Sequence, residues 1–136
     1  MKVRPLNNED YDNILCKWWK DWRWDAPPKD MLPENGTGGV MISIDGVDVC
    51  AGFLYLTNSN TAWVEFIISN FEYKKKDRHE AIIFLINVLT ELAKSKGNKY
   101  IYTSLKNASL ISKYEECGFN KGSENCQEMI KILWQQ

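Results

Sequence analysis

Apolar and polar residues alternate along this chain with the periods of both helices and strands. The clearest helix is predicted over 78–96, where apolar residues recur at helical spacing opposite a polar side: Ile82, Leu85, Ile86, Leu89 and Ala93. Gly97 follows and ends it. Further helices are predicted over 9–20, with Asn7 or Asn8 as a cap, over 28–32, and over 107–117.

The strand period dominates elsewhere. Alternation and β-branched residues predict strands over 2–6, 40–44, 47–57, 61–69 and 100–105, and a closing hairpin of 119–123 with 127–134. Asp45-Gly46 is a typical two-residue hairpin turn, and Gly52 predicts a bulge. A meander followed by a helical crossover indicates an α/β (α+β) fold with a mixed sheet, and we expect one domain over 1–136.

Composition excludes several classes of protein. The chain has 136 residues and a formal net charge of −1, which provides no overall field for nucleic acid or an anionic membrane. No apolar run could span a bilayer, and Met1–Pro5 lacks the apolar stretch of a signal peptide, so we expect a cytoplasmic protein. The 4 cysteines form no close pair and His79 is the only histidine, so we expect no metal site and reduced, mostly buried thiols.

One run in the last third of the chain is more specific. Residues 107–119 read Asn, six residues, then Tyr-Glu-x-x-Gly-Phe, with Asn107, Tyr114 and Gly118 in register. This run resembles the signature of the GNAT superfamily of N-acetyltransferases. The resemblance implies a mixed, largely antiparallel sheet of six or seven strands flanked by about four helices. It also implies acetyl-CoA as co-substrate and direct transfer of its acetyl group to a primary amine.

The family's second signature, Gln/Arg-x-x-Gly-x-Gly/Ala, binds the CoA pyrophosphate at a helix N-terminus. Here Arg78 stands at its first position, while Ala81 and Ile83 replace the two glycines. Lys74, Lys75 and Lys76 precede Arg78, and we expect these side-chain cations to replace part of the missing backbone cradle. His79 stands beside them as a further candidate contact to the cofactor, without a catalytic role. The alternative is an ordinary solvated, lysine-rich loop.

The resemblance also implies catalytic roles. Tyr114 would protonate the leaving thiolate, although its spacing from Leu110 also suits a core aromatic. Glu65 is the candidate base because apolar neighbours should raise its pKa; it shares a strand face with Trp63 and Ile67, and could instead be a surface charge. The backbone of Ile67, Ile68 and Ser69 would pair with the pantetheine arm. Asn107 would contact the cofactor, cap the helix, or do both.

The acceptor is the least defined partner. Trp22 and Trp24 are candidate walls of an acceptor site for a small-molecule or protein amine, with Glu65 beside it; simple packing of the first helix is the alternative. Three functions are open: an N-acetyltransferase, a catalytically inactive acyl-CoA-binding or regulatory relative, and, least favoured, a nucleic-acid-binding domain. The chain could be a monomer or a homodimer.

Overall fold

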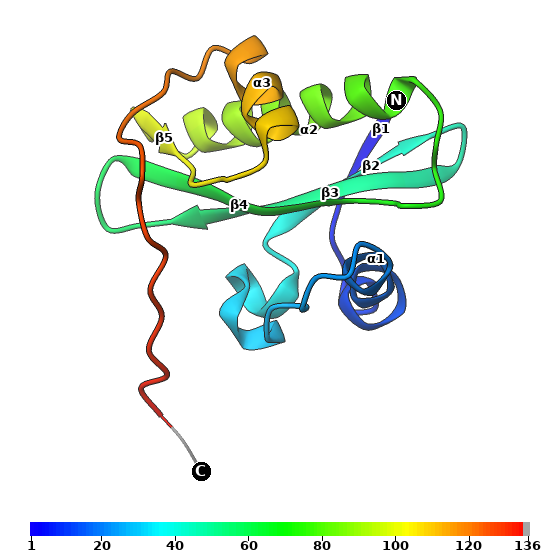
Figure 1. Ribbon diagram of the computed structural model, residues 1–136, viewed down its shortest axis with the longest axis horizontal. Coiled ribbons are helices and arrows are strands. Elements are labelled where there is room, and N and C mark those ends of the chain that lie inside the picture. Colours follow the sequence, from blue (N-terminus) through cyan, green and yellow to red (C-terminus); the bar gives the residue numbers. More distant parts are fainter. Residues whose placement is uncertain (135–136) are drawn as a thin grey trace.

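A five-stranded sheet runs through the middle of the computed structural model, which describes residues 1–134 (Figure 1). The strands lie in chain order: β1 (Lys2–Pro5), β2 (Gly39–Ile44), β3 (Val47–Leu56), β4 (Thr61–Ser69) and β5 (Tyr100–Tyr102). Strands β1 to β4 pair with one another in antiparallel fashion, whereas β5 pairs with β4 in parallel. The parallel pair follows from the long helix α2 (Asp77–Ser95), which carries the chain back before β5 begins.

Helices cover both faces of this sheet. Helix α2 and helix α3 (Ala108–Glu116) lie on one face, and helix α1 (Cys16–Asp21) lies on the other (Figure 1). A π-helical turn, Tyr11–Leu15, precedes α1, and two 3₁₀ turns follow it at Lys29–Met31 and Pro33–Gly36. The helical residues between 9 and 21 therefore confirm the predicted first helix, although its first turn is wider than an α-helix.

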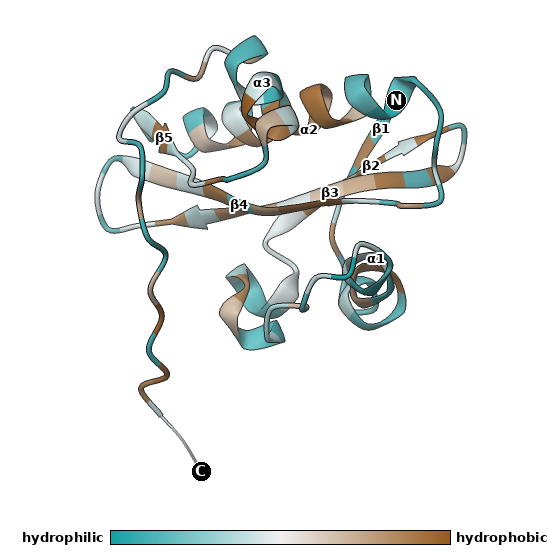
Figure 2. Ribbon diagram, in the orientation of Figure 1, coloured by the Kyte–Doolittle hydropathy of each residue, from teal (hydrophilic) through white to brown (hydrophobic). Residues whose placement is uncertain are grey.

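Two apolar cores result, one on each face. The helical spacing predicted for α2 is confirmed, because Leu85, Ile86 and Leu89 are fully buried against the sheet. Figure 2 shows the corresponding hydrophobic colour along the central strands. Burial of each such side chain contributes about 1.5–3 kcal/mol. The second core packs Leu15, Trp18, Trp19 and neighbouring residues against the opposite face of the sheet.

A bulge in β4 decides which side chains face which core. Phe66 has a φ of 56°, and the β3–β4 register shifts between Ala51 and Phe53. The extra residue of this bulge is on β4, opposite Gly52, so the bulge predicted at Gly52 forms on the neighbouring strand instead. Phe66 packs on the α1 face, whereas Ile67 packs on the α2 face. Glu65 pairs with Phe53, which belongs to the core on the α1 face. The expectation that Glu65 shares a face with Ile67 is therefore wrong, because the extra residue interrupts the alternation between them.

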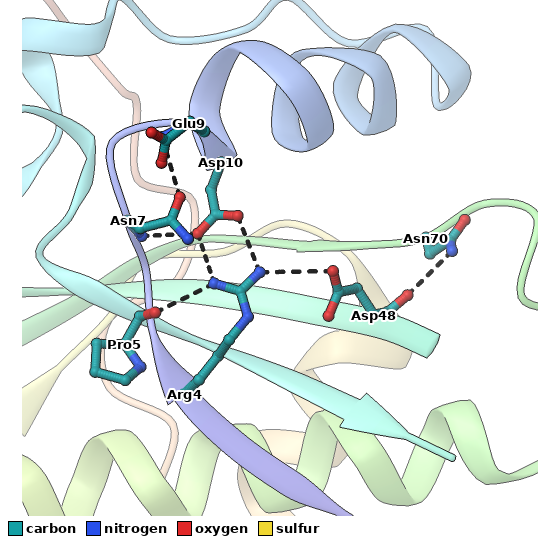
Figure 3. Close-up of polar contacts among 7 residues, drawn as sticks. All are labelled: Arg4, Pro5, Asn7, Glu9, Asp10, Asp48 and Asn70. Carbon is teal, nitrogen blue, oxygen red and sulfur yellow. Dashed lines mark hydrogen bonds and ion pairs between the residues drawn. The ribbon is translucent and has the colours of Figure 1, made fainter. Parts of the chain in front are cut away.

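The start of the chain is fixed to the first helix by a buried carboxylate (Figure 3). Asp10 accepts hydrogen bonds from both terminal nitrogens of Arg4, at 2.8 and 2.9 Å, and from the Asn7 amide at 2.7 Å. Burial alone would raise the pKa of Asp10, but these hydrogen bonds and the Arg4 charge outweigh it and lower that pKa. Asp10 thus joins β1 to the helical layer below the sheet.

The predicted number of elements is wrong at the C-terminal end. Residues 1–134 contain five strands and three α-helices, in place of six or seven strands and about four helices. Strand β5 has three residues, and no strand forms over 119–123 or 127–134. Apolar side chains of this segment, such as Met129 and Leu133, are 88% and 87% exposed. The apolar pattern there has no neighbouring strand to pair with.

Two further properties concern the described residues as a whole. No helix in 1–134 combines the length and the apolar character needed to cross a bilayer.

Of the cysteines, Cys50 is buried, Cys16 and Cys117 are half-buried, and Cys126 is exposed. The expectation of mostly buried thiols is therefore wrong.

Candidate functional site

A cavity of about 420 Å³ lies where the end of β4, the start of α2 and the helix α3 come together. The turn after α1 reaches it from the other layer. Its volume is within the usual range for small-molecule sites. The lining residues are Trp22, Trp24, Ile67, Ser69, Lys75, Lys76, Arg78, His79, Ile82, Asn107, Ser109, Leu110 and Lys113.

Strands β4 and β5 separate beside this cavity. Their pairing ends at Trp63 and Tyr102, and two further hydrogen bonds then close a small junction between the strands. The Thr103 hydroxyl donates to the Val64 carbonyl at 2.7 Å, and the Ser104 amide donates to the Glu65 carboxylate at 3.0 Å. The part of β4 beyond the bulge, including Ile67 and Ser69, is not paired with β5 and lines the cavity instead.

Cations gather at the α2 side of the cavity. Lys75, Lys76, Arg78 and Lys113, which we call the cation cluster, all line it. Helix α2 presents its N-terminus to the same region, which adds the positive end of its dipole. The salt bridges found within residues 1–134 include no member of the cation cluster. The cavity is therefore suited to an anion such as a phosphate group.

The predicted anion site is not a glycine-rich loop, in agreement with Ala81 and Ile83 at the two glycine positions of the family signature. Ala81 is fully buried in the core and does not line the cavity. The loop before α2 is held by Tyr73, whose hydroxyl donates to Asp77 at 2.8 Å and whose carbonyl accepts from Arg78 at 3.2 Å. The Nζ of Lys74 lies 5.3 Å from the Phe71 ring centroid, and Lys74 is not a lining residue.

Helix α3 supplies groups that sequence reasoning missed. Ser109, Leu110 and Lys113 line the cavity, and the Lys113 ammonium donates to the Ser109 hydroxyl at 2.8 Å. Burial lowers the pKa of Lys113, and the nearby Arg78 charge lowers it further. The i, i+4 spacing of Ser109 and Lys113 on the predicted helix was the available signal. Asn107 does cap α3, since its side chain accepts from the Leu110 amide at 3.0 Å, and it also lines the cavity.

The two catalytic candidates lie at the junction and do not line the cavity. Tyr114 is 3% exposed, and its ring meets Phe119 edge-on at 4.9 Å. Burial raises the pKa of Tyr114; a hydrogen bond with Thr103 works against this rise, and the Glu65 charge adds to it. Burial likewise raises the pKa of Glu65, although the Ser104 hydrogen bond lowers it in part. The two side chains are thus electrostatically coupled where the strands part.

The structure therefore brings together most, though not all, of the predicted site. Seven of the predicted cofactor contacts line one cavity: Ile67, Ser69, Lys75, Lys76, Arg78, His79 and Asn107. Ile68, Lys74, Ala81 and Tyr114 do not, and neither does Glu65. Trp22 and Trp24, predicted for the acceptor, line this same cavity beside Arg78. His79 contacts Glu116 of α3 at 3.0 Å, which links the two helices at its rim.

Solved structures of acetyltransferases share this fold. The ribosomal-protein-S18-alanine N-acetyltransferase from Escherichia coli matches with a TM-score of 0.66 and 16% identity, over 90% of this chain and 79% of that one. Glucosamine-6-phosphate N-acetyltransferase from Arabidopsis thaliana matches with a TM-score of 0.62 and 14% identity, over 97% of each. AAC(6')-Iy in complex with the bisubstrate analog CoA-S-monomethyl-acetylneamine matches with a TM-score of 0.64 and 12% identity, over 96% and 98%.

No family model and no curated protein matches the chain. The identities to the solved structures are low, so the similarity establishes the fold and leaves the chemistry to be argued from the residues of this chain.

Proposed function

Because this chain has the fold of the GNAT N-acetyltransferases, we propose that it transfers the acetyl group of acetyl-CoA to a primary amine. The observation that carries the proposal is the cavity, which combines a stretch of β4 that has no β5 partner, the N-terminus of α2 and the cation cluster. The thioester supplies an activated acyl group, and the protein must bind it, orient it and manage protons.

The residues present fit CoA. Lys75, Lys76, Arg78 and Lys113 would hold its phosphates through charge-assisted hydrogen bonds. The backbone of 67–69 would hold the pantetheine arm, because β4 beyond the bulge has no β5 partner. Buried Ala81 and the substitution of the second glycine by Ile83 make side chains the main contributors to this anion site.

Proton transfer would take place at the junction between β4 and β5, where Glu65 and Tyr114 lie. An amine of the lysine type, with a pKa of about 10.4, is mostly protonated at neutral pH and must lose a proton to attack. Glu65, with a raised pKa, would accept that proton directly or through water. Tyr114 stays protonated because its pKa is raised, and it would donate a hydrogen bond to the sulfur as negative charge develops there.

A second candidate function is an acyl-CoA-binding module without catalysis. The specific observation in its favour is that Tyr114 is 3% exposed and that neither it nor Glu65 lines the cavity. Such a protein would bind the ligand with the cation cluster and the part of β4 that has no β5 partner. The junction of β4 and β5 would then have only a structural role. The two candidates share the ligand and differ in turnover.

The test combines binding and turnover. Acetyl-CoA at about 100 times its dissociation constant should stabilise the fold by roughly 2.7 kcal/mol in thermal unfolding. Free thiol release is then measured with three kinds of amine: an alanine N-terminal peptide, an amino sugar phosphate and an aminoglycoside. Stabilisation with thiol release supports the transferase, and stabilisation with none across the panel favours the binding module. No stabilisation contradicts both.

A further inference from the structure

Trp22 makes contacts that reach both layers of the fold. It follows helix α1, and its indole Nε1–H donates to the Ser69 carbonyl, at the end of β4, at 2.8 Å. Its ring meets the Phe71 ring edge-on at 4.9 Å between centroids. Its face lies 5.5 Å from the guanidinium carbon of Arg78, within the range of a cation–π contact. One side chain thus ties the α1 layer to the start of α2.

Arg78 is held from a second direction by the loop that precedes α2. Its Nη1 donates to the Tyr73 carbonyl at 3.2 Å, and Tyr73 is itself buried and bonded to Asp77. A guanidinium has five N–H donors in one rigid plane, so fixing one edge and one face sets the direction of the others. This arrangement pre-organises a group that would otherwise lose side-chain entropy on binding.

The charges around Arg78 favour a negatively charged partner. The Lys113 ammonium faces it from α3, and the Arg78 charge helps to lower the Lys113 pKa after burial. The nearby acids have other partners, since Asp77 accepts from Tyr73 and Glu116 contacts His79. Holding like charges this close is unfavourable without an anion between or beside them.

We propose that Trp22 is a positioning residue that holds the Arg78 guanidinium in place for the pyrophosphate of CoA. It rests on the proposed function, and it gives Trp22 a role on the cofactor side of the cavity rather than as an acceptor wall. The Trp22 ring and the Tyr73 carbonyl fix the Arg78 guanidinium, so that a side chain can bind the phosphates where the family signature uses backbone amides next to glycines. In this role Trp22 acts through Arg78 and takes no part in the chemical step.

The experiment is a double-mutant cycle on dissociation constants, with CoA and phosphate-free pantetheine as probes. Trp22→Leu removes both the ring face and the indole N–H, and it should weaken CoA binding about fivefold, the size of a partly exposed cation–π contact. Pantetheine binding should stay within about twofold, because that probe has no pyrophosphate for Arg78 to bind. In an Arg78→Gln background, Trp22→Leu should add less than about twofold.

Two variants make the result interpretable. Trp22→Phe keeps one aromatic ring beside Arg78 but loses the second ring and the N–H to Ser69, so its effect should be smaller than that of Trp22→Leu. It replaces Trp22→Leu in the cycle if that variant does not fold. Trp63→Leu is the matched control, since Trp63 packs on Tyr102, away from the cavity, and should leave CoA binding unchanged.

Each other outcome contradicts the inference. Equal weakening of CoA and pantetheine would show that Trp22 only maintains the shape of the cavity. Additive effects of Trp22→Leu and Arg78→Gln would show that it does not act through Arg78. Unchanged CoA binding with a raised KM for an amine would return Trp22 to the acceptor side. If the wild-type protein binds no CoA, the proposed function fails with it.

Discussion

The two halves of β4 lead to different kinds of surface. Before the bulge, the strand is paired with β5, and Val64 and Glu65 accept hydrogen bonds from Thr103 and Ser104. After the bulge, β4 has no β5 partner, and Ile67 and Ser69 line a cavity beside the cation cluster. The first half is hydrogen-bonded to the β5 segment. The second half faces the cavity, whose other walls carry the cation cluster.

Under the proposed function, this difference would separate cofactor binding from proton transfer. The half of β4 beyond the bulge lies beside the cation cluster of the α2 region and α3, whose long side chains can attract and hold an anionic ligand. The junction half holds Glu65 and Tyr114, whose pKa values are both raised by burial. Perturbed pKa values cluster at functional sites, which makes the junction the candidate place for proton transfer. Variants on the two halves should therefore change different kinetic parameters.

The largest effect is expected at Tyr114. Tyr114→Phe removes only the hydroxyl, so turnover with acetyl-CoA and an accepted amine should fall at least about tenfold, a minimum set below the roughly 100-fold or more that a positioned proton donor typically contributes. The CoA dissociation constant should stay within about twofold, because Tyr114 is outside the cavity lining. Steady-state kinetics and calorimetry measure the two quantities.

Tyr102→Phe is the matched control, because that tyrosine is 52% exposed on β5 and packs on Trp63. Unchanged turnover in Tyr114→Phe would remove Tyr114 from the mechanism and leave it as a core aromatic.

Glu65→Gln should have a smaller effect, about tenfold at neutral pH, because water can accept part of the proton load. The active form of Glu65 is the carboxylate, whose fraction grows as pH rises through its pKa. Burial raises that pKa above the ordinary value of about 4.3, so the acidic limb of the wild-type rate profile should lie above it. The variant should lack this limb and keep any rise caused by the acceptor amine. An acidic limb that persists in the variant would assign it to another group.

The order of elements up to β5 could be predicted from the sequence because local physics determines it. Helix α2 has apolar residues at the right spacing, and Asp45-Gly46 adopts positive φ values of 50° and 80° in its turn. The closing hairpin was predicted and does not form, since an apolar segment becomes a strand only where a neighbour accepts its backbone hydrogen bonds. The three residues of β5 leave 127–134 without one.

The site divides in the same way. Arg78 and Asn107 were found because the family signature gives their positions in the chain. The bulge at Phe66 could not be read from the alternation of β4, and it separates Glu65 from Ile67. The contact between Trp22 and Arg78 joins residues far apart in sequence, so only the folded arrangement reveals it.

Removing charges from the cation cluster should weaken CoA binding without changing the rate of the chemical step. In Lys75→Gln/Lys76→Gln, the CoA dissociation constant should rise a few-fold, roughly 1 kcal/mol or less for each exposed charge. Turnover at saturating acetyl-CoA should be unchanged. The wild-type affinity should also fall more steeply with salt than that of the variant, because fewer charges remain to be screened. Lys96→Gln, an exposed lysine at the far end of α2, is the matched control. Equal affinities in the variant and the control would place the phosphates elsewhere.

The smallest effect tests whether the half of β4 before the bulge is held by the hydrogen bond that joins β4 to β5. Thr103→Val keeps the shape of the side chain and removes the hydroxyl that donates to Val64 at 2.7 Å, which should lower the free energy of unfolding by about 1 kcal/mol. Urea denaturation measures this loss, and Thr103→Ser, which retains a hydroxyl, should recover most of it. Thr103 also moderates the rise in the Tyr114 pKa, so Thr103→Val should lower turnover as well while CoA binding stays constant. If Thr103→Val weakened CoA binding as much as turnover, the two halves of β4 would not be functionally separate, because a change confined to the junction would have reached the cavity.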